Sequence, residues 1–334
     1  VNTLEGTKTI RAENVVIATG STPIELPILP FGGKVISSTE ALAQNKVPKK
    51  MIVVGGGYIG LEIGTAFAKL GSAVTVIEAD DRILPQYDAA LTKPVKVTLE
   101  SLGITVLTQT KAKGLENGNL ITETAGSVAE LETDLILVAV GRTPRSDSAN
   151  IEILGLTMDG VYIRINDRCE TSMRGVYAIG DVTGEPMLAH RAMAQGELVA
   201  ERIAGHPRVW DKACIPAVCF TDPEIVCCGL SSREAKDKGI DVQVGQFPFA
   251  ANGRAMTTET ETGFVRVIAR KDNGLILGFQ ATGVGISDLS ASFATAIEMC
   301  ARLEDMSSII HAHPTRSEAI QEASLSALGI PLHI

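Results

Sequence analysis

Three glycines, Gly55, Gly57 and Gly60, and one acid, Glu78, have types and spacing that could do chemistry. The glycines follow the pattern G-x-G-x-x-G. This pattern permits a sharp turn after a strand, close approach of the backbone to a ligand, and tight packing of the following helix. Backbone N–H groups at the positive end of that helix bind phosphate. The pattern therefore predicts a dinucleotide site.

The acid at Glu78 predicts which dinucleotide binds. Its carboxylate is the expected acceptor for both ribose hydroxyls, and it repels a 2′-phosphate. Asp80 and Asp81 add to that repulsion, so NAD is favoured over NADP. Glycine-rich turns also join strands and helices that bind nothing, so the flanking elements must support the prediction.

Two strands and a helix are expected around these residues. Met51–Val54 and Ala73–Ile77 are short apolar runs typical of buried strands. The helix between them runs to Leu70, and Gly71 is placed to end it. Its predicted buried face consists of Ile59, Ile63, Ala66, Phe67 and Leu70.

A second candidate site follows the apolar strand Val176–Ala178. Gly180 and Asp181 come directly after it, and a helical pattern opens at Met187–Ala189 and runs through Ile203. An acid beside a helix start can bind a cofactor hydroxyl while the helix amides face negative charge. The alternative is an aspartate that only caps a helix.

His313 and Glu318 form a third candidate. The carboxylate could orient the imidazole and make it a general base near neutral pH. Alternatively, Thr315-x-x-Glu318 fits a capping box at the start of the last helix. His311 and His313 as metal ligands are disfavoured, since no Cys or His partner stands at metal spacing.

The chain has six cysteines, and Cys214 and Cys219 have C-x-x-x-x-C spacing. In an extended run these two side chains face opposite sides and lie ~16 Å apart, beyond disulfide reach. A helix N-terminus that would lower a thiol pKa is also missing. We interpret them, with Cys227 and Cys228, as buried thiols in a reducing compartment.

Composition excludes several classes of protein. The 334 residues are 45% hydrophobic and 4% aromatic, as in an Ala/Val/Gly-rich α/β protein. A net charge of -9 argues against nucleic acid or an anionic membrane as a main partner. We find no signal peptide and no apolar run of the ~20 residues that span a membrane, so a cytoplasmic placement is expected.

The first strand, Val15–Ala18, is predicted to be buried and parallel, and it leads into the turn Thr19-Gly20-Ser21. A parallel strand needs a sheet with helices on both faces. We therefore expect an N-terminal segment, outside this sequence, to supply that sheet.

The remaining pattern predicts an α/β fold with Rossmann-like domains and a C-terminal α+β domain built on an antiparallel sheet. Further helices are expected at 38–43, 91–102, 231–238, 289–302 and 317–328. Further strands are expected at 104–107, 135–140, 242–249, 263–270 and 275–281, and a hairpin at 114–126 turns at Asn117-Gly118.

Five segments resemble the motifs of dihydrolipoamide dehydrogenases, a family of flavin disulfide oxidoreductases. They read GGGYIGLEIG, IEADDRILP, VAVGRTPR, YAIGDVTGEPMLAHRAMAQG and HAHPTRSEA, in the order that the family carries them. FTDPE, FPFAANGRAM and the terminal LHI resemble the form that serves branched-chain 2-oxoacid dehydrogenase complexes. The resemblance covers essentially the whole chain.

The resemblance implies four domains and two cofactors, FAD and NAD. The domains are an FAD-domain remnant (1–24), an NAD domain (25–149), a central domain completing the FAD site (150–215) and a dimer-interface domain (216–334). On the NAD side it implies Gly55, Gly57, Tyr58, Ile59, Gly60, Glu62, Glu78, Gly141 and Arg142; Tyr58 screens the flavin, and Glu62 faces an upstream lysine. On the FAD side it implies Thr19, Gly20, Gly180, Asp181, Met187, Leu188 and Ala189.

The implied reaction is NAD-dependent oxidation of protein-bound dihydrolipoamide by a homodimer. His313, held by Glu318, would act on the flavin and disulfide of the other subunit, and lipoyl domains and an acyltransferase core would be partners. The family's FAD-binding glycine motif and redox Cys-x-x-x-x-Cys pair precede the matched region, so this chain alone is expected to be inactive. A glutathione- or mercuric-reductase relative, disfavoured by Glu78, and a non-catalytic NAD-binding, dimerising module remain alternatives.

Overall fold

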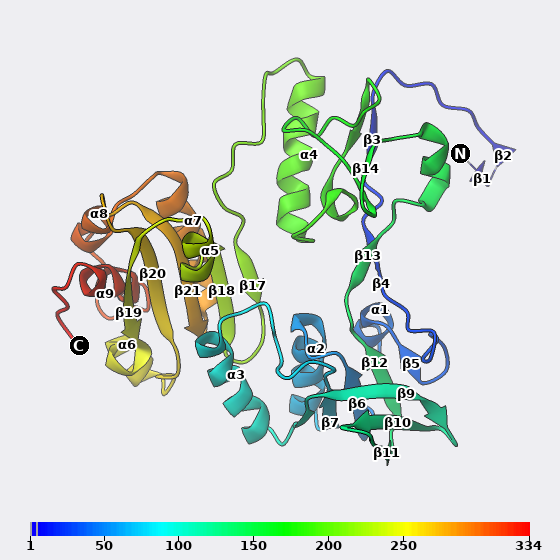
Figure 1. Ribbon diagram of the computed structural model, residues 1–334, viewed down its shortest axis with the longest axis horizontal. Helices are drawn as coiled ribbons and strands as arrows, with labels where there is room; N and C mark the ends of the chain where they lie inside the picture. Colours follow the sequence, from blue (N-terminus) through cyan, green and yellow to red (C-terminus); the bar gives the residue numbers. More distant parts are fainter. Residues whose placement is uncertain (1, 5) are drawn as a thin grey trace. The chain divides into compact units, whose positions relative to one another are not determined.

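The computed structural model describes residues 2–4 and 6–334 (Figure 1). The chain folds into two compact units. The first unit combines the stretch that ends at Pro23 with residues 142–212, and the second combines residues 24–141 with 213–334. Within the described residues, no helix is long and apolar enough to cross a membrane.

The second unit begins with a parallel sheet in the order β5-β12-β6-β7-β8. Its strands are β5 (Val35–Ile36), β12 (Leu135–Val138), β6 (Lys50–Val54), β7 (Ala73–Ile77) and β8 (Thr105–Leu107). Along β6, Met51 and Val53 enter one apolar cluster and Ile52 and Val54 enter another. Both faces of the sheet are therefore covered, which explains the continuous apolar run of this strand.

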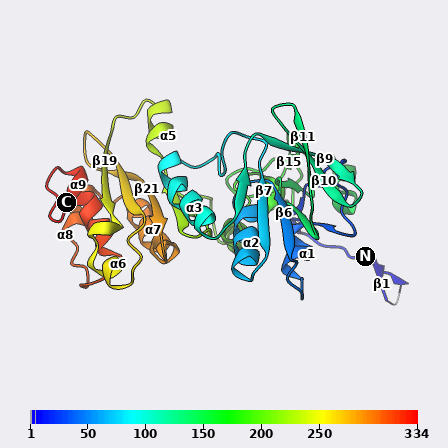
Figure 2. The same ribbon diagram turned by 90° about the horizontal axis from the view of Figure 1, so that it is seen from below.

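Three helices and a small sheet accompany these strands. The helices are α1 (Ser38–Leu42), α2 (Tyr58–Lys69) and α3 (Ala89–Ser101), and Figure 2 shows α2 beside β6 and β7. The small antiparallel sheet consists of β9 (Thr110–Glu116), β10 (Asn119–Thr124) and β11 (Ser127–Leu131). Asn119 pairs with Glu116, so the predicted hairpin turn at Asn117-Gly118 is confirmed, and β11 extends it by one strand.

The buried face predicted for α2 is only partly correct. Ile63 and Phe67 are buried, but Ala66 is exposed and Leu70 exposes 66% of its surface. Small residues determine the actual face, because Gly60 and Gly64 lie against Val53 of β6. Leu70 is the C-cap residue, and Gly71 follows with φ +105, as expected for the residue that ends the helix.

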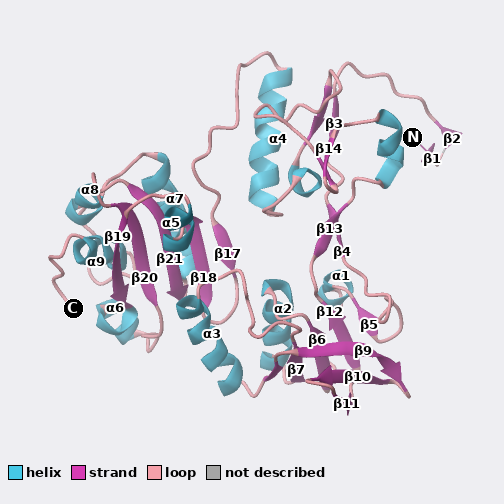
Figure 3. Ribbon diagram, in the orientation of Figure 1, coloured by secondary structure: helices cyan, strands magenta, loops and turns pink. Residues whose placement is uncertain are grey.

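The rest of the second unit is built on an antiparallel sheet in the order β17-β18-β21-β20-β19 (Figure 3). Its strands are β17 (Ala217–Cys219), β18 (Glu224–Gly229), β19 (Val242–Pro248), β20 (Phe264–Arg270) and β21 (Ile276–Gly283). The helices are α5 (Ser232–Asp237), α6 (Gly253–Thr257), α7 (Ser290–Glu298), α8 (Leu303–Ser308) and α9 (Glu318–Ala327), with short 3-10 turns η3 (Phe249–Ala251) and η4 (Ile286–Leu289). In the core between sheet and helices, the rings of Phe279 and Phe293 stack 4.6 Å apart.

The long helix predicted at 289–302 extends four residues too far. It ends at Glu298, because Cys300 adopts a left-handed conformation with φ +54, and α8 starts separately at Leu303. Leu275 and Arg302 form an isolated bridge at this point.

Within the described residues, the first unit contains four two-stranded sheets, one helix and two 3-10 turns. They are β1 (Asn2–Thr3), β2 (Gly6–Thr7), β3 (Val15–Ile17), β4 (Ser21–Pro23), β13 (Arg142–Pro144), β14 (Met158–Asp159), β15 (Tyr162–Ile163), β16 (Val176–Ala178) and α4 (Ala189–Ile203), with 3-10 turns η1 (Ser148–Leu154) and η2 (Gly180–Thr183). β3 pairs in parallel with β16, and β4 pairs antiparallel with β13.

The first predicted strand, β3, is less buried than expected. Ile17 is buried, but Val15 and Val16 expose 46% and 41% of their surfaces. Ile17 joins Ala178 and Val182 in the apolar cluster of this unit, whereas the other two valines lie outside it. Among the described strands, β16 is the only one that pairs with β3.

Candidate functional site

The turn between β6 and α2 has the backbone geometry that the glycine pattern predicts. Gly55 has φ +110, and a Cβ there would lie 2.5 Å from the carbonyl oxygen of Ala139. A Cβ on Gly60 would lie 2.4 Å from the carbonyl oxygen of Gly55. Larger residues at either position would thus push the turn away from the neighbouring strand or the helix away from the turn.

Gly57 differs from these two glycines. It is the N-cap residue of α2, and a Cβ on it would have no described atom within 4 Å. The space in front of this 12-residue helix is open, its cap has no side chain, and the first turn carries no acid. Such a helix start suits an anion, so the turn fits the pyrophosphate of a dinucleotide.

Glu78 lies at the end of β7 and faces the same turn. Its Oε2 accepts a hydrogen bond from the Gly56 N–H at 2.6 Å, and its Oε1 accepts one from the Asp80 N–H at 2.8 Å. A carboxylate has about four acceptor positions, so both oxygens keep capacity for ribose hydroxyls. The carboxylate is thus held beside the turn in one orientation.

The first five residues of α2 include three further predicted residues. Tyr58 and Ile59 are half-buried and pack on the cluster beneath the sheet. Glu62 accepts a hydrogen bond from the backbone N–H of Phe220 at 2.8 Å. Burial raises the pKa of Glu62, and the Phe220 hydrogen bond opposes that shift. Within this chain, Glu62 therefore anchors the segment that follows β17.

In the first unit, Asp181 stands at one end of a hydrogen-bonded chain that runs through Ser21 to Arg142. The hydroxyl of Ser21 donates to Asp181 Oδ2 at 2.5 Å, and Arg142 Nε donates to the same hydroxyl oxygen at 2.7 Å. Arg142 also donates to the Ser21 carbonyl oxygen at 2.9 Å. The two predicted groups, Asp181 and Arg142, are therefore joined through the turn that contains Gly20.

That turn is held from its other side as well. The Thr19 hydroxyl donates to the Arg145 carbonyl oxygen at 2.9 Å, and the Arg145 N–H donates to the Gly20 carbonyl oxygen at 2.9 Å. Gly20 has φ +70. Gly141, which precedes Arg142, has φ +124 and belongs to the other compact unit.

Gly180 and the start of α4 form a second strand–turn–helix. The Gly180 N–H donates to Oε1 of the buried Gln195 at 2.7 Å. Met187 and Leu188 are half-buried, Ala189 is exposed, and Leu188 occupies the N-cap position with a side chain that cannot accept a hydrogen bond. With Asp181 in the preceding turn, the residues fit a polar cofactor near an uncapped helix start.

Arg191, the third residue of α4, fixes the loop before the helix. Its Nη1 donates to the Gly184 and Pro186 carbonyl oxygens at 2.5 and 3.3 Å, and its Nη2 donates to the Thr183 hydroxyl at 3.0 Å. Burial lowers the pKa of this guanidinium, and the charge of Asp181 opposes that effect. Ser21, Arg191 and Gln195 were not predicted as site residues; the i, i+4 spacing of Arg191 and Gln195 was the available signal.

His313 and Glu318 lie together at the start of α9. Nδ1 of His313 is 2.8 Å from Glu318 Oε1, and the Thr315 N–H donates to Glu318 Oε2 at 2.7 Å. Burial acts to raise the pKa of Glu318, but the hydrogen bonds from Thr315 and His313 outweigh it, so the pKa is lowered. The Glu318 carboxylate thus binds both the His313 imidazole and the backbone of the turn at Thr315.

The predicted capping box is only half present. The N-cap residue of α9 is Ser317. The Thr315 hydroxyl donates to the Ala312 carbonyl oxygen at 2.8 Å, so its side chain stabilises the preceding loop. The buried Asn252 supports that loop too, since its Nδ2 donates to the Thr315 carbonyl oxygen at 3.0 Å. His311 Nδ1 lies 3.0 Å from the Ile309 carbonyl oxygen, and its charge also acts to lower the pKa of Glu318.

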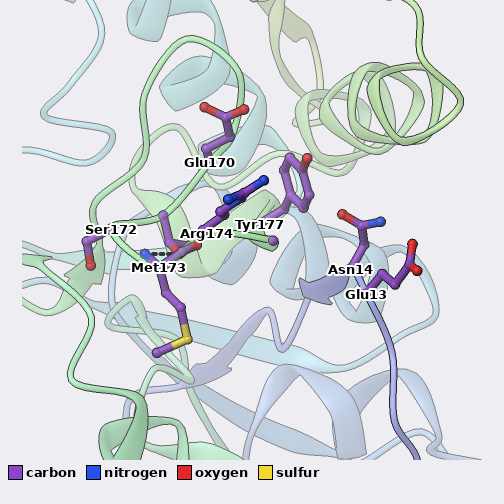
Figure 4. Close-up of a pocket in the computed structure, with 9 residues that line it drawn as sticks. Glu13, Asn14, Glu170, Ser172, Met173, Arg174 and Tyr177 are labelled. Atoms are coloured by element: carbon purple, nitrogen blue, oxygen red, sulfur yellow. Dashed lines mark hydrogen bonds between the residues drawn. The ribbon is translucent and has the colours of Figure 1, made fainter.

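The first unit also has a pocket of about 840 Å³, apart from these residues (Figure 4). Glu13, Asn14, Glu170, Thr171, Ser172, Met173, Arg174, Gly175 and Tyr177 line it. Glu170 is engaged by Arg202 at 3.0 Å and by Asn166 at 2.9 Å. None of the predicted site residues lines this pocket, so it is not the predicted cofactor site.

The fold and these turns define a dinucleotide-binding protein with parallel α/β sheets and a C-terminal antiparallel domain. The model of the pyridine nucleotide-disulphide oxidoreductases matches residues 1–196, and that of their dimerisation domain matches residues 215–324. The chain belongs to the pyridine nucleotide-disulphide oxidoreductase family.

Individual relatives agree with this assignment. The chain is 58% identical over 330 residues to a dihydrolipoyl dehydrogenase of Pseudomonas aeruginosa, covering 98% of this chain and 71% of that protein. It is 42% identical over 335 residues to the dihydrolipoyl dehydrogenase of Geobacillus stearothermophilus, covering 99% of this chain and 71% of that protein. The crystal structure of LpdA from Mycobacterium tuberculosis superposes with a TM-score of 0.87 at 25% identity, covering 96% of this chain and 71% of that one.

Proposed function

We propose that this protein oxidises protein-bound dihydrolipoamide to lipoamide with NAD, through FAD and a redox disulfide. Two relatives that carry the name dihydrolipoyl dehydrogenase, at 58% and 42% identity, support the substrate. The observation that carries the proposal is the geometry of His313 and Glu318. With Nδ1 facing the carboxylate, Nδ1 holds a proton and Nε2 is left as the proton acceptor.

A dithiol must lose a proton before it can act as a nucleophile, because the thiolate is the reactive form. His313 exposes 76% of its side chain, so Nε2 is accessible to a substrate thiol. Glu318 stabilises the imidazolium that results and keeps the ring in one orientation. His313 is therefore assigned as general base and Glu318 as the residue that positions it.

The same chain has residues for both cofactors. Gly55, Gly57, Tyr58, Ile59, Gly60 and Glu78 would hold NAD at the start of α2, while Thr19, Gly20, Gly180, Asp181, Met187, Leu188 and Ala189 would hold FAD, with Arg142 orienting Ser21. When bound, the two cofactors supply two-electron transfer from dithiol to nicotinamide. The residues of this chain bind and orient them.

The proposal extends to partners and placement. The dimerisation-domain match supports a homodimer, and the substrate implies lipoyl domains and the acyltransferase core of a 2-oxoacid dehydrogenase complex. The FTDPE and FPFAANGRAM segments favour the branched-chain complex. Six free cysteines fit a reducing, cytoplasmic setting.

The test uses the natural full-length protein. We expect flavin absorbance and NAD-dependent oxidation of dihydrolipoamide, with NADP a poor substitute. His313→Gln should lower kcat at least ~100-fold, the scale of general-base catalysis, with the Kd for NAD unchanged. His311→Gln is the matched control and should keep wild-type turnover. A colourless protein, or undiminished turnover in His313→Gln, would overturn the proposal.

A further inference from the structure

Two cysteines far apart in the sequence have their sulfurs in contact. Cys214 comes three residues before β17 and Cys228 lies within β18, and their Sγ atoms are 3.2 Å apart. The antiparallel pairing of β17 with β18, which places Ala217 opposite Cys227, brings them together (Figure 1). Cys219 is not part of this pair, because its sulfur faces the Thr221 hydroxyl at 3.6 Å.

The backbone of Cys214 is fixed in this position. Oε1 of Glu298, the last residue of α7, accepts hydrogen bonds from the Ala213 N–H at 2.9 Å and the Cys214 N–H at 3.2 Å. Cys214 also packs against the apolar cluster that contains Cys228. The contact between the sulfurs is therefore supported by the backbone and by packing.

The two thiols have different surroundings. Cys214 is half-buried, whereas Cys228 is 1% exposed. The hydrogen bond with Cys228 lowers the pKa of Cys214, against burial and the charge of Glu298. The same hydrogen bond, together with burial, raises the pKa of Cys228. Cys214 is thus the less buried thiol and has the greater thiolate character, and Cys228 is its protected neighbour.

We propose that Cys214 and Cys228 form an oxidisable dithiol that hydrogen peroxide converts to a disulfide. The Cys214 thiolate attacks one peroxide oxygen, so the O–O bond breaks, an S–O bond forms and one water leaves after the released hydroxide takes a proton. The Cys228 sulfur then attacks the Cys214 sulfur; the S–S bond forms, the S–O bond breaks and a second water carries away the Cys228 proton. The two thiols lose two electrons, and the peroxide gains them.

The neighbouring cysteines should remain reduced at the same peroxide dose. Burial raises the pKa of Cys219 to about 11 and that of Cys227 to about 12. Cys227 belongs with the apolar cluster of the parallel sheet, and Cys228 belongs with that of the antiparallel sheet. Cys227 and Cys228, although adjacent in β18, therefore pack in different clusters, and Cys228 is the one that contacts Cys214.

Peptide mapping of the full-length protein tests the proposal, after graded hydrogen peroxide and alkylation of the remaining thiols. Trypsin leaves Cys214, Cys219, Cys227 and Cys228 on one peptide, Ala213–Arg233, so a second cleavage after Glu224 is needed. We expect the two halves to be linked with a loss of two hydrogens, and fragmentation should assign the link to Cys214 and Cys228. Dithiothreitol should release it.

Three variants supply the controls. In Cys228→Ser, oxidation of Cys214 should stop at the sulfenic acid, which dimedone traps. In Cys214→Ser, which removes the half-buried thiol, Cys228 should stay reduced. Cys300→Ser removes an exposed thiol elsewhere and should leave the link unchanged. Free thiols at both positions of the wild type, a link to Cys219 or Cys227, or oxidation of Cys228 in Cys214→Ser would overturn the proposal. These readouts do not depend on catalytic activity.

Discussion

The turn before α2 and the turn before α4 solve a similar problem in different ways. Both lead from a parallel strand to the start of a helix whose N-cap residue has no capping side chain. At the first, backbone fits against backbone through Gly55 and Gly60. At the second, side chains hold the backbone, through Gln195 on Gly180 and Arg191 on Gly184. A backbone-built turn is sensitive to added atoms, and a side-chain-built turn is sensitive to removed ones.

Two glycine variants should have the largest effects and should separate folding from binding. In Gly60→Ala the new Cβ meets the Gly55 carbonyl oxygen, so we expect about 1–3 kcal/mol loss of stability together with loss of NAD binding. In Gly57→Ala the Cβ meets open space, so stability should be unchanged. Its Kd for NAD should nevertheless rise about tenfold or more, since the methyl group enters the space for the pyrophosphate.

Urea denaturation and NAD titration on the same two proteins provide the measurements. Wild-type NAD affinity in Gly57→Ala would contradict the placement of the pyrophosphate. Wild-type stability in Gly60→Ala would contradict the backbone-built character of the first turn.

Gln195→Leu tests the second turn. It removes the acceptor of the Gly180 N–H inside a buried site, so the free energy of unfolding should fall by about 1–3 kcal/mol, and flavin retention should fall with it. Met193→Ala, at an exposed position of the same helix, is the matched control and should change neither quantity. An unchanged flavin content in Gln195→Leu would mean that this turn does not depend on its side-chain support.

Glu78→Gln tests whether the first turn has any side-chain support. Gln keeps one oxygen for the Gly56 N–H but turns an amide group toward the Asp80 N–H, so we expect a stability loss of about 1 kcal/mol. The Kd for NAD should rise, and the preference for NAD over NADP should narrow, because the negative charge is gone. An unchanged ratio of the two Kd values would show that Asp80 and Asp81 set the preference.

The same difference between the two turns explains which features of the fold and of the candidate site the sequence could predict. The β6–α2 turn could be predicted because a glycine in the sequence records a local backbone constraint directly. Gln195, Arg191 and Ser21 were not recognised, since the spacing of Arg191 and Gln195 does not reveal partners that lie in other elements. The contact between Cys214 and Cys228 was missed for that reason too: it depends on the register of β17 with β18. The exposed Ala66 and Leu70 show the same limit, as periodicity alone does not give the rotation of a helix on its sheet.

The start of α9 offers the smallest and most specific test, because one carboxylate there supports both a turn and a base. The pKa of Glu318 is lowered from its ordinary 4.5 in the folded protein, so the carboxylate contributes stability above that pH and loses it as the pH falls through the lowered value. The Tm difference between wild type and Glu318→Gln should therefore be a few degrees at neutral pH and should shrink in acid. His311→Gln leaves the hydrogen bond between His313 and Glu318 intact, so its Tm difference from the wild type should stay small at neutral pH. A difference for Glu318→Gln that grows as the pH falls would contradict the hydrogen bonds from Thr315 and His313 as the source of the lowered pKa.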